Sequence, residues 1–310
     1  MAWREVGPYA DAMVSGSLDE HAALVALLQA RPDGLSWPHI TAELLEVGSA
    51  VEVWKRHVPA TLMDLPGDVT PGSAARDVHG WTAQGCRLIS ILDEDYPAGL
   101  RGIHQAPPVI FTMGRVLVDD PGVSVVGSRE ASAQGIAMAA EIAQALVARQ
   151  MTVVSGLARG IDTAAHRAAL HAGGRTVAVI GTGISRAYPP ENRALQDEIG
   201  RRGLVLSQFW PDTHGDKHTF PMRNATMSGY GLATVVVEAS EKSGARIQAR
   251  LAVEHGRQVI LADQVVARNQ WAQALLGRPG VHVASSVDGV MDVIEQVVAM
   301  WDELRRLVIP

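Results

Sequence analysis

The stretch VSVVGSREASAQG (residues 123–135) joins a short run of apolar, mostly β-branched residues to small and polar ones. Two later stretches follow the same plan: MTVVSGLARGIDTAAH (151–166) and TVAVIGTGI (176–184). In each of them a predicted buried strand ends in small residues before the next helical pattern, which is typical of a parallel sheet with helical crossovers. The sequence therefore predicts an α/β fold built on a doubly wound sheet.

The loops that follow these strands predict a binding surface for phosphate-bearing ligands. Ligands of parallel sheets bind at the carboxyl ends of the strands, where small residues let backbone N–H groups approach an anion. Arg129 can also form a bidentate contact with a phosphate. The glycine spacing is not GxGxxG, so no dinucleotide fingerprint is present. The candidate residues are Gly127, Ser128 and Arg129, then Ser155, Gly156, Arg159 and Gly160, and then Gly181 and Gly183.

Arg159 and Asp162 have a second interpretation. Asp162 can cap the helix that follows the loop, or the two side chains can form an ion pair that fixes the turn. The second of these roles needs no ligand.

Residues 212–229 show no clear period and hold four further candidates, Lys217, Phe220, Arg223 and Asn224. An unpaired base exposes its faces, so an aromatic ring can stack on it while flanking cations hold the DNA backbone. This set therefore favours single-stranded nucleic acid as a ligand. The alternative is that Phe220, which precedes a proline, only anchors the loop to the core.

The titratable residues do not predict catalysis or a metal site. The histidines in and near the loops have no metal-ligand spacing and are interpreted as structural or surface residues; they are His166, His171, His214 and His218. Glu238 ends a predicted strand, but no nucleophile or second carboxylate accompanies it. We therefore expect no catalytic residue, no metal and no cofactor.

Composition indicates a globular intracellular protein. The chain has 310 residues, of which 47% are hydrophobic, and a net charge of −6. Residues 121–230 carry 11 Lys/Arg against 8 Asp/Glu, a net charge of +3. The segments on either side, 1–120 and 231–310, have net charges of −8 and −1, so a polyanion would bind best to the central segment. The single cysteine, Cys86, indicates a reducing compartment. Because no long apolar run or signal segment occurs, the expected location is the cytoplasm.

The order of patterns predicts a helical module followed by the sheet. We expect a small helical domain at 1–60, a linker and connecting helix at 61–84, the sheet domain at 85–286 and a terminal helix at 287–310. The linker prediction rests on the prolines and glycines of residues 60–76. Further expected helices are 135–150, 161–172 and 190–202, and expected strands are LVLSQFW, ATVVVEA and QVILA.

The ordered motifs resemble the DNA-processing protein A family, also called DprA or Smf. They include G-S-R-x-x-S-x-x-G (127–135), S-G-L-A-R-G-I-D-x-x-A-H (155–166), Y-P-x-x-N (188–192) and F-P-x-R-N (220–224). The resemblance implies an extended Rossmann-like domain preceded by a small helical domain of the SAM or helix-hairpin-helix type. It also implies a non-enzymatic homodimer that binds and protects single-stranded DNA in natural transformation and recombination, and helps to load the RecA recombinase. Its DNA contacts would be Gly127, Ser128, Arg129, Lys217, Phe220 and Arg223, while Ser155, Gly156, Arg159 and Gly160 would shape the same pocket.

Several residues depart from the family pattern. Gln208 stands where the family has glutamate, Ala225 where it has a second arginine, and Gln248 where it has threonine. A Pro-Gly motif expected after QVILA is replaced by Asp263 and Gln264. We expect most of these changes to fall around the ligand cleft.

Three hypotheses about function follow from the sequence. The first is a non-enzymatic module that binds single-stranded DNA. The second, motivated by the altered residues, is a sensor or hydrolase of a nucleotide-derived ligand, in one version within a phage-defence system. The third is an interaction protein that recruits a partner through its acidic helical module.

Overall fold

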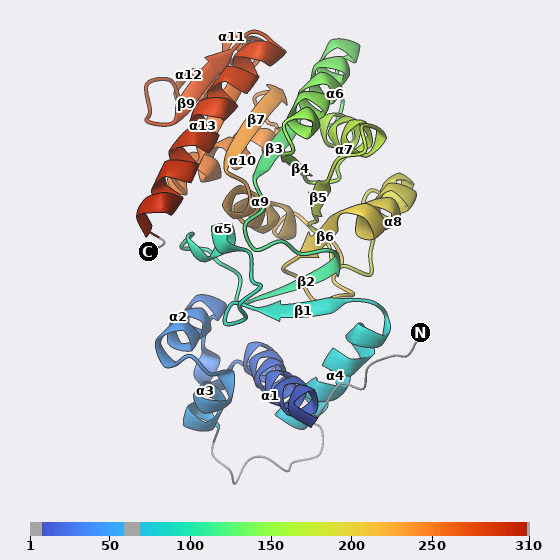
Figure 1. Ribbon diagram of the computed structural model, residues 1–310, viewed down its shortest axis with the longest axis vertical. Coiled ribbons are helices and arrows are strands. Elements are labelled where there is room, and N and C mark those ends of the chain that lie inside the picture. The colour runs from blue at the N-terminus through green and yellow to red at the C-terminus, as the bar shows by residue number, and fades with distance from the viewer. Residues whose placement is uncertain (1–7, 59–68, 309–310) are drawn as a thin grey trace. The chain divides into compact units, whose positions relative to one another are not determined.

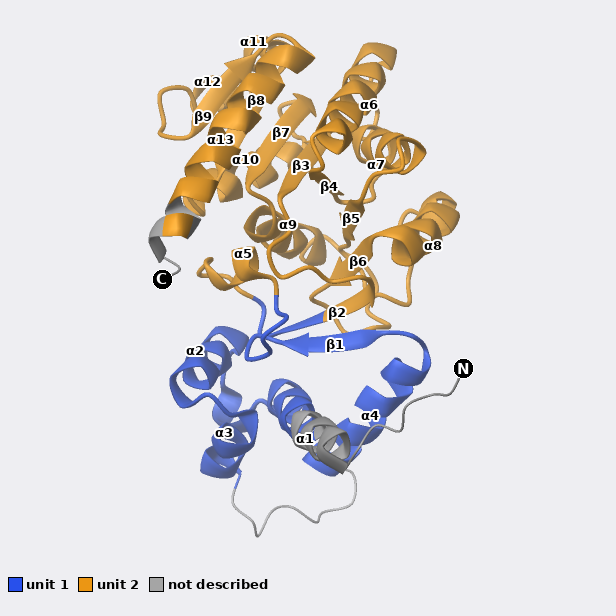
Figure 2. Ribbon diagram, viewed as in Figure 1, with its two compact units in different colours: residues 1–96, 107–110 blue, residues 97–106, 111–310 orange. Residues whose placement is uncertain are grey.

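The computed structural model describes residues 8–58 and 69–308, without the side chains of 8–18, 304, 305, 307 and 308. It divides the chain into two compact units, residues 1–96 with 107–110, and residues 97–106 with 111–310 (Figures 1 and 2). No described helix is long and apolar enough to cross a membrane. The domain boundaries expected from the sequence remain predictions.

The first unit is built mainly from helices. Its elements are α1 (Pro8–Ala30), η1 (Pro32–Gly34), α2 (Trp37–Val47), α3 (Ala50–His57), α4 (Pro71–Ala83) and the short strand β1 (Arg87–Ser90). Ser36 and Ser49 cap α2 and α3 by accepting backbone N–H bonds, as residues of this type commonly do. Helices were expected in this part of the chain, and α1, α2 and α3 confirm them, with breaks between the helices.

Helix α4 begins earlier than its sequence predicts. Pro71 occupies its first turn, and Thr70 and Ser73 form a reciprocal capping box. The interpretation of 71–76 as linker is therefore wrong, because proline and glycine at a helix start look like linker residues in sequence. Residues 60–68 of that predicted linker lie outside the described residues.

The second unit is organised around a sheet whose strand order is β2-β6-β5-β4-β3-β7-β8-β9. The pairing of β2 with β6 is antiparallel, and the other pairs in that order are parallel. The strands are β2 (Val109–Gly114), β3 (Gly122–Gly127), β4 (Thr152–Ser155), β5 (Thr176–Val179), β6 (Leu204–Ser207), β7 (Ala233–Glu238), β8 (Gln258–Ala262) and β9 (Val281–Ala284). The doubly wound α/β sheet predicted from the loops is confirmed.

Helices cover both faces of this sheet, and alternate strand residues serve each face. Val123, Val125 and Val153 pack in one core cluster with α6 (Ala133–Ala148), α7 (Ile161–His171) and α13 (Val287–Val308). On the other face, the Ser124 hydroxyl donates to the carbonyl of Met227 in α9 (Thr219–Tyr230), and α9 packs against α10 (Gly244–Glu254). The remaining helical segments are α5 (Ala98–Arg101), η3 (Pro190–Asn192), α8 (Arg193–Arg202), α11 (Asp263–Arg268) and α12 (Gln270–Gln273).

Helix α9 forms where the sequence shows no period. From Arg223 to Tyr230 every residue is buried, polar and apolar alike. A helix enclosed on all sides has no apolar stripe, so its sequence lacks the signal by which a surface helix is recognised. Strand β9 and helices α11 and α12 were also not predicted.

Candidate functional site

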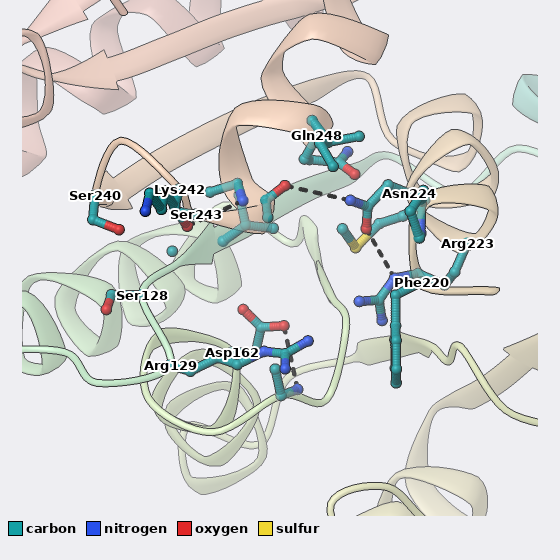
Figure 3. Close-up of a pocket in the computed structure, with 18 of the residues that line it drawn as sticks. Ser128, Arg129, Asp162, Phe220, Arg223, Asn224, Ser240, Lys242, Ser243 and Gln248 are labelled. Carbon is teal, nitrogen blue, oxygen red and sulfur yellow. Dashed lines mark hydrogen bonds between the residues drawn. The ribbon is translucent and has the colours of Figure 1, made fainter. Parts of the chain in front are cut away.

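A cleft of about 490 Å³ opens beyond the carboxyl ends of β3 and β7 (Figure 3). These strands are neighbours in the sheet, yet the chain leaves β3 toward β4, β5 and β6 before it returns to β7 on the other side. This reversal is a topological switch point, where the loops of adjacent strands diverge and leave a crevice. Three segments supply most of the lining: the loop after β3, helix α9 with the residues before it, and the loop into α10 with the start of that helix. Ala158 and Asp162, which follow β4, also line the cleft.

The first wall is the Gly127–Ser128–Arg129 loop. A Cβ added to Gly127 would lie 2.6 Å from Ile161 Cγ1 and 2.7 Å from the Glu238 carbonyl oxygen, so only glycine fits there. The backbone N–H of Ser128 donates to that same Glu238 oxygen at 2.7 Å. The tight packing places Ser128 and the exposed Arg129 on the cleft.

The second wall is a face of α9. Phe220, Arg223, Asn224 and Met227 line the cleft at the i, i+3, i+4, i+7 spacing of one helical face, and the exposed Lys217 precedes them. The guanidinium carbon of Arg129 lies 5.4 Å from the centre of the Phe220 ring, within cation–π range. Side chains predicted from distant parts of the sequence therefore meet here.

Glycines and an aromatic ring support the Phe220 side chain. A Cβ on Gly181 would lie 2.5 Å from Phe220 Cδ1, and one on Gly215 would lie 2.9 Å from Phe220 Cζ. The Tyr188 ring adds a tilted contact with its centre 5.2 Å from that of Phe220. Phe220 is thus held in place while remaining partly exposed to the cleft.

Arg223 differs from the other cations because it is 6% exposed. Its Nη1 donates to the carbonyl oxygens of Gly156 at 2.6 Å and Val179 at 2.7 Å, and its Nε donates to Asn224 Oδ1 at 3.0 Å. Burial, and secondarily the charge on Arg129, lower the pKa of Arg223 to about 10. The guanidinium therefore stays charged at neutral pH and joins the residues that end β4 and β5.

Asp162 compensates this buried charge electrostatically. Its Oδ2 accepts from the backbone N–H of Gly156 at 3.1 Å and of Ala158 at 3.3 Å. Burial raises the pKa of Asp162, although the positive charge of Arg223 opposes this rise. The predicted pairing of Asp162 with Arg159 is wrong: Arg159 is exposed, and its Nε lies 3.4 Å from Glu191 Oε1.

The third wall was not identified from the sequence. Ser240, the exposed Lys242 and Ser243 follow β7, and Ser243 caps α10 by accepting from the Ala245 N–H at 3.2 Å. The sequence pattern that marks such a loop is present here too, because small residues follow an apolar strand as they do in the three recognised loops. Lys242 is therefore a further cation at the cleft.

Comparisons with known proteins match this chain to one family. The family described as DNA recombination-mediator protein A matches residues 87–297. The chain belongs to this DNA recombination-mediator protein A family. It is 46% identical over 222 residues to the DNA processing protein DprA of Streptococcus pneumoniae, an alignment that covers 71% of this chain and 76% of that protein. The resemblance found in the motifs is confirmed.

A second curated relative and two solved structures also resemble this chain. Protein Smf of Synechocystis is 42% identical over 172 residues, covering 54% of this chain but only 43% of the cyanobacterial protein. The X-ray structure of S. pneumoniae DNA processing protein A has a TM-score of 0.67 at 33% identity, covering 89% of this chain and 97% of that one. The Helicobacter pylori protein, described for its single-stranded DNA binding mode, shares the fold with a TM-score of 0.60 at 22% identity, covering 69% and 96% of the two chains.

In this member of the recombination-mediator family, several predicted binding residues shape the cleft without lining it. Ser155 is buried and donates to the Val125 carbonyl at 2.7 Å. A Cβ on Gly156, Gly160 or Gly183 would collide with Arg223, with the Ser128 carbonyl or with the Trp210 carbonyl, respectively. These residues and Gly181 pack against neighbouring groups and do not line the cleft, so their direct contact with a ligand stays a prediction.

The departures from the recombination-mediator pattern lie mostly away from the cleft. Gln208 is buried and its Oε1 accepts from the Thr226 hydroxyl, and Ala225 is buried on α9. Neither lines the cleft, whereas Gln248 does. The expectation that most of the changes surround the ligand cleft is therefore wrong, because Gln208 and Ala225 are buried residues that do not line it.

The remaining titratable candidates have structural partners. Glu238 accepts from the backbone N–H of Ser132 at 3.1 Å and from its hydroxyl at 2.5 Å, which ties β7 to the start of α6. No group of three or more metal-ligating side chains occurs within the described residues. His166 is fully buried, with Nδ1 2.7 Å from Thr176 Oγ1.

His166 makes the stability of this family member depend on pH. Burial lowers its pKa from 6.5 to about 3, so the folded state favours the neutral ring and the unfolded state takes up the proton first. The preference of the folded state for neutral His166 therefore costs no stability above pH 6.5. As the pH falls from 6.5 toward 3, protonation of the unfolded state lowers the free energy of unfolding. We expect the unfolding free energy to drop by about 2 kcal/mol more between pH 7 and pH 5 in the wild type than in His166→Gln.

Urea unfolding of both proteins at the two pH values measures this difference. Groups other than His166 titrate in both proteins and therefore cancel in the comparison. Equal losses of stability would show that His166 is not the group responsible.

Proposed function

We propose that the protein binds single-stranded DNA across this cleft, with backbone phosphates on Arg129, Lys217 and Lys242 and a base against Phe220. The observation that carries the proposal is the convergence of three exposed cations, from three separate segments, around one partly exposed aromatic ring. Family membership supports it, because the name of the H. pylori relative's structure describes single-stranded DNA binding.

The chemistry of the cleft suits a single strand better than a duplex. Cations placed along a groove neutralise phosphates of either form, but an aromatic side chain stacks only on a base whose face is free. The start of α10, capped by Ser243, adds positive potential at the same rim. A duplex would present phosphates to Arg129 and Lys217 but no base face to Phe220.

We propose further that the protein acts without catalysis, in the cytoplasm. Asp162, Glu238 and His166 are engaged in hydrogen bonds that organise the fold. The homodimer, the loading of RecA and the role in transformation are carried forward as proposals that rest on family membership. The nucleotide-sensor alternative loses most of its motivation, because only Gln248 among the three central departures lines the cleft.

Binding of a labelled oligo-dT and of its duplex with oligo-dA, each at two salt concentrations, tests this function. We expect the single strand to bind more tightly than the duplex. The plot of log K against log salt concentration should have a slope of about −2 or steeper, because each of three neutralised phosphates of a single strand contributes about −0.7. No retention of oligo-dT at low salt, or equal affinity for the duplex, would contradict the proposal.

A further inference from the structure

Gln248 has an unused hydrogen-bond acceptor in the wall of the cleft. The residue lies on α10, lines the cleft and is only 1% exposed. Its Nε2 donates to Thr234 Oγ1 at 3.4 Å, whereas its Oε1 has no hydrogen-bond partner. A buried acceptor without a partner costs about 1–3 kcal/mol, so such groups in a binding cleft point to a donor that arrives with the ligand.

Neighbouring polar groups do not supply that donor. Figure 3 shows Gln248 near Asn224, whose Nδ2 donates to the Gly244 carbonyl at 3.4 Å and makes no hydrogen bond to Gln248 Oε1. The Asn224 oxygen in turn accepts from Arg223 Nε. The Gln248 oxygen therefore has no donor among the described residues, in a side chain that lines the cleft.

Among the groups of a DNA strand, the partner that suits this oxygen is a neutral N–H group. A phosphate offers only acceptors and would be repelled by the Gln248 oxygen, while a small cation would be repelled by Arg129, Lys217 and Lys242 at the rim. Within a DNA strand the sugar–phosphate backbone has no internal donor, so only the bases carry N–H groups. The exocyclic amino groups of adenine, cytosine and guanine protrude from the base edge, whereas the imino N–H of thymine is recessed between two carbonyl oxygens.

We propose that Gln248 accepts a hydrogen bond from the exocyclic amino group of a nucleobase that enters the cleft edge-on, and that the cleft therefore favours amino-bearing bases. The inference rests on the proposed function and deepens it, because Phe220 and the cations hold any base whereas Gln248 selects among bases. Selection of this kind comes from pairing a buried polar group that is otherwise unsatisfied.

Two oligonucleotides that differ only in this amino group test the proposal. A homopolymer of deoxyadenosine and one of deoxynebularine, the same purine nucleoside without the amino group, stack alike and carry equal charge. In fluorescence anisotropy at one salt concentration, we expect the wild type to bind the adenine strand about 3–10-fold more tightly. In Gln248→Leu, which keeps a similar shape but has no acceptor, we expect the two strands to bind equally.

Each outcome bears on the proposal separately from DNA binding itself. Equal binding of both strands by the wild type, or an undiminished preference in Gln248→Leu, would overturn the role of Gln248 while leaving DNA binding in place. Failure to bind either strand would overturn the proposed function and this inference with it. The wild-type ratio decides the matter even where the variant does not fold. Deoxycytidine and its 2-pyrimidinone analogue repeat the comparison in a pyrimidine.

Discussion

Arg223→Met lowers the free energy of unfolding by about 3–5 kcal/mol, the cost expected when one member of a buried, hydrogen-bonded charged set is removed. The variant leaves the Gly156 and Val179 carbonyl oxygens without the guanidinium that now joins them. It also leaves Asp162 buried without its opposing charge. Urea unfolding at neutral pH, followed by circular dichroism, measures the loss.

Two controls separate this structural role from direct DNA contact. Arg246→Met changes an exposed arginine of α10 and should shift the unfolding free energy by less than about 0.5 kcal/mol. Arg223→Lys keeps the charge but not the planar fork that reaches two carbonyls and Asn224, so most of the loss should persist. A stable Arg223→Met that no longer binds oligo-dT would show that Arg223 serves mainly as a ligand contact.

The triple variant Arg129→Ala, Lys217→Ala, Lys242→Ala should lose about 100-fold in affinity for oligo-dT near 0.1 M salt. Each lost phosphate contact removes about 0.7 from the slope of log K against log salt, so three remove about 2. These side chains are exposed, and their removal should leave thermal stability almost unchanged. Filter binding over a salt series gives both the affinity and the slope.

A second triple variant with the same change in net charge serves as the control for overall charge. Arg201, Arg250 and Arg278 are exposed on the same unit and do not line the cleft. Their replacement by alanine should alter affinity only a few-fold through the long-range field. Equal losses in the two triple variants would mean that net charge, not the cleft, governs binding.

The sheet could be predicted because buried parallel strands carry a local signal. The β-branched runs that begin at Val123, Thr152 and Thr176 are each followed by small residues, and all three are strands in the structure. The loop after β7 carries the same signal and was overlooked, which is why Lys242 was missed. Helix α9 could not be recognised, because burial on every side removes the period that marks a helix.

The sequence by itself determined the strand–loop–helix order and the kinds of side chain available near the sheet edge, since both follow from local patterns. Only the tertiary structure decided which of those side chains reach a ligand. Arg129 and Lys217 lie exposed on the cleft, whereas Arg223 is turned inward to carbonyls at the ends of two strands. Burial is set by contacts between residues far apart in the chain. Arg129 is therefore an exposed cation at the cleft, whereas Arg223, with the same chemistry, is a buried structural residue.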